Sequence, residues 1–117
     1  MEVRDYAKRF NDELNLGGLR REVTSYTFNS RCLVVYSLYE LEDYNKCIVM
    51  LSRTIEGLMS DLIANRINNK KLAFLGVELL EQIQQKIPIG NFEKFENFDR
   101  FEMENSIASI KYNLNSK

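Results

Sequence analysis

The most constraining feature of the sequence is the helical spacing of its apolar residues, which recur three and four positions apart along most of the chain. The clearest run lies between Tyr44 and Ile67, and its apolar positions are Ile48, Leu51, Ile55, Leu58, Met59, Leu62 and Ile63. A stripe of this length and width is typical of a helix that is buried on a broad face. The sequence therefore predicts an all-α fold in which residues 44–67 form the central helix.

The other segments keep the same spacing, and their ends carry ordinary helix signals. Gly17-Gly18 is expected to end the first helix, Asp43 is a suitable N-cap for the central helix, and Pro88 follows the fourth. The predicted helices cover residues 3–16, 19–41, 44–67, 70–87 and 98–114, with a connection over 89–97. Strand-favouring residues over 23–30 leave a break near Thr27–Ser30 open. Because short connections favour antiparallel neighbours, we expect one domain, residues 1–117, built as an antiparallel bundle of four to five helices.

The charge balance bears on the kind of partner that the chain can have. It carries 16 Lys and Arg against 17 Asp and Glu, a net charge of −1, whereas nucleic-acid-binding domains usually show a clear basic excess. No apolar stretch approaches the ~20 residues that a membrane span requires, and Met1 to Phe10 lacks the apolar core of a signal peptide. We therefore expect a cytoplasmic protein without membrane contact, for which nucleic acid is a less favoured partner than protein.

The two cysteines, Cys32 and Cys47, are predicted to be reduced residues of the core. They fall on consecutive helices, ten and four residues from the turn at Glu42-Asp43. At ~1.5 Å of rise per residue this is an axial offset of about 9 Å. A disulfide requires Cα atoms within roughly 7 Å of each other.

The chain contains no histidine, and this absence removes most catalytic sites from consideration. Serine and cysteine nucleophiles paired with histidine, zinc sites with histidine and carboxylate di-iron bundles all need that side chain. No glycine-rich phosphate loop is present either. Glu56 and Asp61 are a carboxylate pair on one predicted helix, but at five residues apart they point in different directions. We expect no enzyme activity, no cofactor and no metal.

Two aromatic groups are the candidates for a partner surface. Phenylalanines recur every third residue at Phe92, Phe95, Phe98 and Phe101, with charged residues in most of the gaps. A strict spacing of three drifts around a helix, so these four side chains cannot share one narrow core face. Tyr36 and Tyr39 lie one helical turn apart, beside the expected core stripe. For both groups two interpretations stay open, namely packing inside the bundle and an exposed docking surface for a partner or a second copy.

A third feature is Arg53, which lies within the apolar central helix. Glu56 follows three residues later and could form an ion pair with it on the helix surface. The alternative is an anion contact made by Arg53 together with Lys70 and Lys71.

The stretch from Cys32 to Glu56, CLVVYSLYELEDYNKCIVMLSRTIE, resembles a single tetratricopeptide repeat. Tyr44 matches the aromatic residue after the turn, Cys47 the small residue and Leu51 the large one, whereas Thr54 replaces the usual late alanine. Val35 and Glu42 stand where that repeat usually has glycine. The match occurs once, and a solenoid requires several copies.

A longer stretch, residues 43–89, is similar to helical bundles of the HEPN type. The matching pieces are the turn DYN, the helix SRTIEGLMSDLIANRI, the polar turn NNKK and the helix LLEQIQQKIPI. The resemblance implies a four-helix bundle that often dimerises. Ribonuclease members of that family use an arginine followed by a histidine. Arg53 matches the arginine but no histidine exists, so the resemblance implies a non-catalytic member.

The sequence thus favours a small non-enzymatic interaction module, an adaptor, inhibitor or assembly factor that binds another protein or a second copy of itself. The alternative is a non-catalytic HEPN-like module linked to RNA or DNA, or to a phage-defence or toxin-antitoxin system. This alternative predicts that basic residues gather on one face, namely Arg20, Arg21, Arg53, Lys70 and Lys71.

Overall fold

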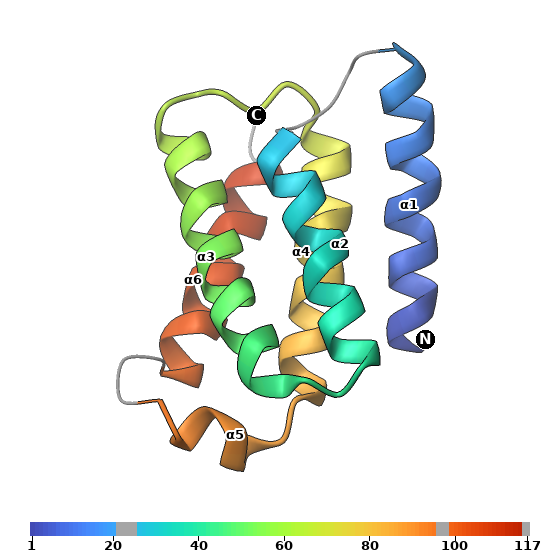
Figure 1. Ribbon diagram of the computed structural model, residues 1–117. Coiled ribbons are helices and arrows are strands. Elements are labelled where there is room, and N and C mark those ends of the chain that lie inside the picture. Colours follow the sequence, from blue (N-terminus) through green and yellow to red (C-terminus); the bar gives the residue numbers. More distant parts are fainter. Residues whose placement is uncertain (21–25, 96–98, 116–117) are drawn as a thin grey trace.

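The computed structural model describes residues 1–20, 26–95 and 99–115, and all the regular structure in these ranges is helical. The helices are α1 (Val3–Arg20), α2 (Tyr26–Glu40), α3 (Tyr44–Ile63), α4 (Lys70–Lys86), α5 (Ile89–Glu93) and α6 (Arg100–Asn115) (Figure 1). The prediction of an all-α helical bundle is confirmed. It consists of five long helices and the single short helix α5 within the described ranges.

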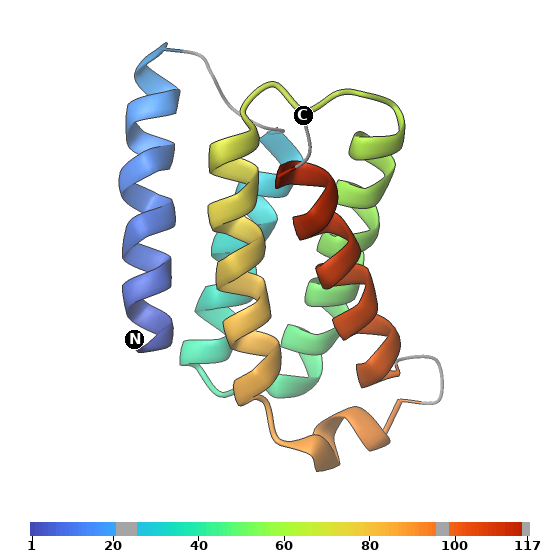
Figure 2. The ribbon, with the colours of Figure 1, turned by 180° about the vertical axis from the view of Figure 1, so that it is seen from behind.

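The long helices alternate in direction along the chain, as Figures 1 and 2 show from opposite sides. Helices α2, α3, α4 and α6 form the bundle, α1 packs on its flank against α4, and α5 lies across the end near the α2–α3 turn. Helix α4 contacts all four other long helices, whereas α3 packs mainly against α2 and α6. The expectation that residues 44–67 are the central helix is therefore wrong, because α4 holds that position.

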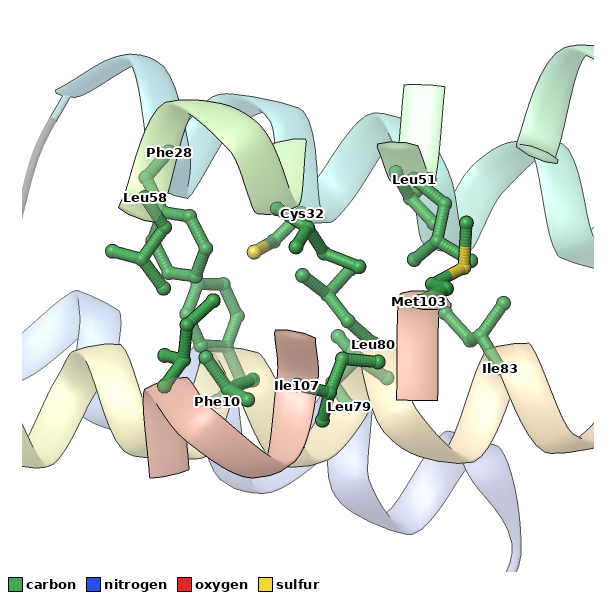
Figure 3. Close-up of a cluster of buried hydrophobic side chains, with 14 of the residues drawn as sticks. Phe10, Phe28, Cys32, Leu51, Leu58, Leu79, Leu80, Ile83, Met103 and Ile107 are labelled. Carbon is green, nitrogen blue, oxygen red and sulfur yellow. The ribbon is translucent and has the colours of Figure 1, made fainter. Parts of the chain in front are cut away.

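The core is one cluster of buried apolar side chains among the described residues, and every long helix contributes to it (Figure 3). Phe10 of α1 and Phe28 of α2 reach the same point on α4, where Gly76 leaves room for their rings. A Cβ atom on Gly76 would lie only 2.7 Å from Cε2 of Phe28. Gly76 therefore permits the close approach of three helices at this point.

Both cysteines lie in this core as free thiols, as predicted. The Cys47 thiol donates to the carbonyl oxygen of Val35 at 3.5 Å and so links α3 to α2. Burial raises the pKa of both thiols, that of Cys47 to about 12, with the Asp43 carboxylate adding to the effect at Cys47. Thiolate chemistry at neutral pH is therefore suppressed at both residues.

The helix starts predicted from the sequence are correct for α3 and α4. The Asp43 carboxylate accepts from the Lys46 amide at 3.4 Å, and the Asn69 side chain accepts from the Leu72 amide at 3.0 Å. Pro88 follows the C-cap residue of α4, Ile87, as predicted. These local capping signals are independent of tertiary packing, which is why the sequence reveals them.

Helix α3 ends four residues earlier than predicted, at Ile63. Asn65 adopts φ 56°, its amide donates to the Leu62 carbonyl at 3.1 Å, and the Arg66 amide donates to the Asp61 carbonyl at 2.8 Å. This pair of bonds is a Schellman motif with asparagine in the left-handed position that glycine usually takes. Helix α2 ends in the same way, with φ 59° at Glu42.

Two further expectations are wrong, and one question that the sequence left open is answered. Helix α1 runs through Gly17-Gly18 to Arg20, since glycine tolerates helical geometry at a cost of only about 1 kcal/mol. The open break near Thr27–Ser30 does not occur, because those residues belong to α2. The connection expected over 89–97 contains α5. Within the described ranges, no helix combines the length and the hydropathy needed to cross a membrane.

Candidate partner-binding surfaces

The phenylalanine series divides between the core and the surface. Phe92 is buried in the core, which agrees with packing inside the bundle and not with an exposed docking surface at this residue. Phe95 is half-buried and packs against the core, and Phe101 is 75% exposed. Phe98 lies outside the described residues. The division follows from the short helix α5, which turns Phe92 inward before the chain reaches α6.

Phe95 forms one wall of an apolar groove at the end of the bundle where α5 lies. The groove has a volume of about 380 Å³ and is lined by Leu38 of α2, by Asn45, Lys46, Val49 and Met50 of α3, and by Phe95. Two hydrogen bonds hold its wall in place. The Phe95 amide donates to the Phe92 carbonyl at 3.1 Å, and the Asn91 side chain donates to the Asn45 side chain at 3.3 Å. The groove is within the size range of ligand-binding pockets in proteins.

Phe101 projects from the first turn of α6, at the same end of the molecule as the apolar groove. Its amide donates to the Asp99 carboxylate at 2.7 Å, which fixes the start of the helix. Asp99, two positions before Phe101, and Glu102, directly after it, are both exposed, whereas Arg100 between them pairs with Glu104 at 3.3 Å. Lys46, which lines the groove, is exposed and lies 3.7 Å from the Asp43 carboxylate. Lys94 and Glu93, which precede Phe95 in the sequence, are exposed as well. The exposed charges that flank Phe101 in the sequence are thus acidic, whereas the charged side chain that lines the groove, Lys46, is basic.

The two candidate tyrosines lie in a different place, between α2 and the start of α1. Both are half-buried and packed against the core. Tyr39 lines a small hollow with residues of α1, and its ring lies 6.3 Å from that of Tyr44. Burial raises the pKa of both phenols, aided at Tyr36 by a hydrogen bond with Glu40 and at Tyr39 by Tyr44. Tyr36 and Tyr39 therefore stabilise a helix junction, and they do not extend the surface around Phe101.

The three candidate anion contacts are all exposed, but no described contact joins Arg53 to the lysines. Lys71 pairs with Glu13 of α1 at 3.6 Å, whereas the backbone of Arg53 accepts from Arg31 of α2. The ion pair expected between Arg53 and Glu56 is not formed among the described residues. The side chains of Arg20 and Arg21 lie outside what the structure describes.

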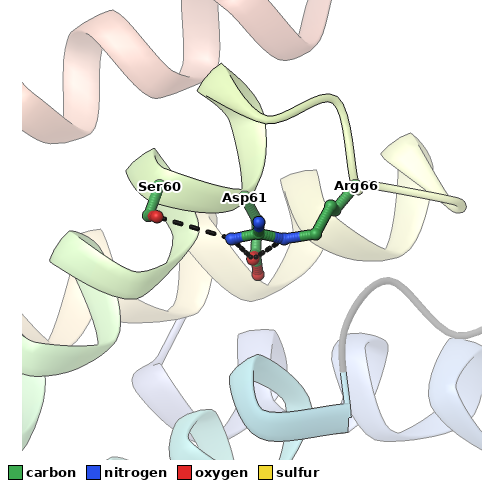
Figure 4. A network of polar contacts seen from close by, with 3 residues as sticks. All are labelled: Ser60, Asp61 and Arg66. Carbon is green, nitrogen blue, oxygen red and sulfur yellow. Dashed lines mark hydrogen bonds and ion pairs between the residues drawn. The ribbon is translucent and has the colours of Figure 1, made fainter.

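A polar hollow that the sequence analysis missed lies at the other end of the α2–α3 pair. It has a volume of about 230 Å³, and its polar lining includes Thr27 and Arg31 of α2, Ser60 and Asp61 of α3, and Arg66. The Schellman turn brings Arg66 back over the last turns of α3. There, its Nε and Nη2 atoms contact the Asp61 carboxylate at 3.1 and 3.0 Å, and Nη2 donates to Ser60 at 3.4 Å (Figure 4). Asn65 is the one sequence signal that could have indicated this turn.

The carboxylates considered for acid–base chemistry do not converge. Asp61 is paired with Arg66, and Glu56 lines a separate hollow between α3 and α6 together with Asp99 and Glu102. In the described part of the chain, no group of three metal-ligating side chains is placed to hold an ion.

Together these features define the chain as a small all-α bundle with an apolar groove at one end and a polar hollow at the other. Comparison with models of known protein families, with curated proteins and with solved structures gives no match. The resemblances to HEPN bundles and to a tetratricopeptide repeat therefore stay predictions.

Proposed function

We propose that this chain is a non-enzymatic helical interaction module that works by binding protein, and that its first partner is a second copy of itself. The observation that carries the proposal is an apolar groove and an exposed Phe101 at the same end of the molecule. An exposed phenylalanine and an open apolar groove both leave apolar surface in water, and burying such surface drives association.

A second copy suits the groove in both geometry and charge. Phe101 and the groove lie at the same end of the molecule, so a two-fold axis can bring each Phe101 to the groove of the other copy. The acidic neighbours of Phe101 would then face Lys46 and Lys94. Opposite charges around an apolar centre favour encounter in this orientation over others. The resulting dimer is closed, so it does not grow into a filament.

The proposal includes a cytoplasmic location, with which two buried free thiols are compatible. It assigns no catalytic role, cofactor or metal to the chain. Adaptor, inhibitor and assembly-factor roles are all compatible with binding through the groove.

The test is the molar mass in solution, measured by light scattering coupled to size exclusion. We expect a dimer for the wild type and a folded monomer for Phe101→Asp. Tyr112→Asp is the matched control, because Tyr112 is on the same helix and is also 75% exposed, but lies toward the other end of it. A monomeric wild type would overturn the self-association, as would an equal loss of dimer in both variants.

The polar hollow favours the alternative proposal of a non-catalytic HEPN-like module that contacts RNA or DNA. Arg31 and Arg66 would then provide the cationic surface, in place of the separated Arg53, Lys70 and Lys71. Binding to single-stranded RNA that weakens steeply with salt would support this alternative. A dimer without nucleic-acid binding would support the first proposal.

A further inference from the structure

The polar hollow between α2 and α3 contains an arginine whose hydrogen-bonding capacity is largely unused. Arg31 is half-buried, and its guanidinium lies against α3 at Gly57, where a Cβ atom would come within 3.2 Å of Nη1. A guanidinium has five N–H donors. Among the described residues, Arg31 uses only one of them, in a long 3.4 Å bond from Nη1 to the Arg53 carbonyl. No described carboxylate pairs with it.

Arg66, on the opposite wall, is held in a defined position. Its Nε and Nη2 atoms are occupied by Asp61 and Ser60, while Nη1 has no partner within the described ranges. Two guanidinium groups and one carboxylate leave the hollow with one net positive charge. The hydroxyls of Thr27 and Ser60 add donors to the same lining.

We propose that this hollow binds a phosphate group. Guanidinium forks match phosphate oxygens in a bidentate geometry, which an ammonium or an amide cannot reproduce. Arg31 supplies the main contact, and Asp61 competes with the anion for Arg66. The volume of about 230 Å³ leaves room for such a group and for several water molecules.

Because Asp61 competes with the anion for Arg66, two substitutions in the hollow should change phosphate affinity in opposite directions. Arg31→Gln removes the principal fork and is expected to weaken phosphate binding about tenfold, the effect of one charge-assisted hydrogen bond. Asp61→Asn releases Arg66 from its ion pair and is expected to strengthen binding several-fold. Each variant has a control with the same change in charge elsewhere. Arg53→Gln removes a nearby exposed arginine, and Asp12→Asn removes a carboxylate of α1 that pairs with Lys8.

The experiment is a titration of the full chain with inorganic phosphate at constant ionic strength, followed by two-dimensional amide NMR. The expected result is saturable shifts at residues of the hollow, weakened by Arg31→Gln, strengthened by Asp61→Asn and unchanged in both controls. Arg31→Lys keeps the charge but loses the fork, so it should also bind more weakly than the wild type. Equal responses in variants and controls, or no saturable shift in the wild type, would overturn the proposal.

A parallel titration with a short oligouridylate identifies the source of the phosphate group. If the group belongs to a nucleic-acid backbone, the oligonucleotide binds more tightly than inorganic phosphate, depends on Arg31 and weakens steeply with salt. If the group belongs to a small phosphorylated molecule, the oligonucleotide binds no more tightly than phosphate. Both results support the site, whereas oligonucleotide binding that does not depend on Arg31 contradicts it. Because the hollow is remote from Phe101, these variants should leave the proposed dimer intact.

Discussion

At the scale of single residues, two glycines inside helices have opposite roles. Gly76 of α4 accommodates the rings of Phe28 and Phe10, so an added methyl group would meet rigid aromatic carbon at 2.7 Å. Gly57 of α3 faces only the flexible end of Arg31, at 3.2 Å. Alanine would raise the helix propensity at both positions, but only Gly57 has room for the added methyl group.

We therefore predict that Gly76→Ala lowers the free energy of unfolding by about 1–2 kcal/mol, because overpacking outweighs the helix-propensity gain of about 1 kcal/mol. Gly57→Ala should raise it by up to about 1 kcal/mol. Urea denaturation followed by circular dichroism measures both. A stabilised Gly76→Ala variant would show that the three helices can move apart at this point without cost.

The buried thiol of Cys47 gives a prediction for alkaline pH. Burial raises its pKa from 9.0 to about 12, so the folded state keeps the proton where the unfolded state releases it. The stability associated with this shift is complete below about pH 9 and is lost as the pH rises toward 12. The pKa values of Tyr36 and Tyr39 are also raised, so these phenols add to the same decline.

The contribution of Cys47 can be measured from how steeply the free energy of unfolding falls with rising pH. Cys47→Ala should be less stable than the wild type near neutral pH, because a buried side chain is shortened, but it should lose less further stability between about pH 8 and about pH 10.5. The urea midpoint of both proteins at the two pH values measures this difference. Parallel decline in the two proteins would show that Cys47 does not titrate in this way.

At the scale of secondary-structure elements, the ends of α2 and α3 depend on residues in the left-handed region. Glu42 has φ 59° and Asn65 has φ 56°. A glutamate in this conformation costs roughly 1–2 kcal/mol, and an asparagine costs less because its short polar side chain tolerates it. Each turn is nevertheless formed, because its two backbone bonds satisfy the last carbonyls of the helix.

Glu42→Gly is accordingly predicted to raise the free energy of unfolding by about 0.5–1 kcal/mol, after allowance for the greater freedom of glycine in the unfolded chain. Asn65→Gly should give a smaller gain. Asn105→Gly, at an exposed position inside α6, is the control and should lower stability by up to about 1 kcal/mol. Thermal unfolding of the three variants ranks them, and a loss of stability in Glu42→Gly would contradict this account of the turn.

The elements also show how far the sequence could predict the structure. The stripe that begins at Ile48, the cap at Asp43 and the stop at Pro88 are local patterns, and they appear as predicted, except that Ile63, the last residue of the predicted stripe, is 81% exposed at the end of α3. The continuation of α1 through Gly17-Gly18 and the inward turn of Phe92 in α5 carry no comparable local signal. Local propensity cannot predict them, because packing against other elements decides such cases.

At the scale of the whole molecule, the two candidate surfaces lie at opposite ends of the α2–α3 pair (Figure 1). The apolar groove combines Leu38, Met50 and Phe95 from three separate segments, and the polar hollow combines Arg31 with Arg66. Such combinations exist only after folding. The sequence could indicate that Phe95 and Phe101 are candidates for a partner surface. It could not predict the groove between the helices, or that Arg31 and Arg66 line the same hollow.

Charge reversal at the proposed interface tests whether Phe101 of one copy contacts the groove of the other. Lys46 lines the groove, and Glu102 follows Phe101. We predict that Lys46→Glu and Glu102→Lys each weaken the dimer several-fold, because each places like charges across the interface. The double variant should recover most of the loss. Lys70→Glu, an exposed reversal on α4 at the opposite end, is the control.

The measurement is the dimer dissociation constant of these four variants and the wild type, obtained by sedimentation equilibrium at low salt, with thermal unfolding to verify that each is folded. The expected result is a weaker dimer for both single reversals, recovery in the double variant and no change for Lys70→Glu. Additive weakening in the double variant, or a wild type that stays monomeric, would contradict it.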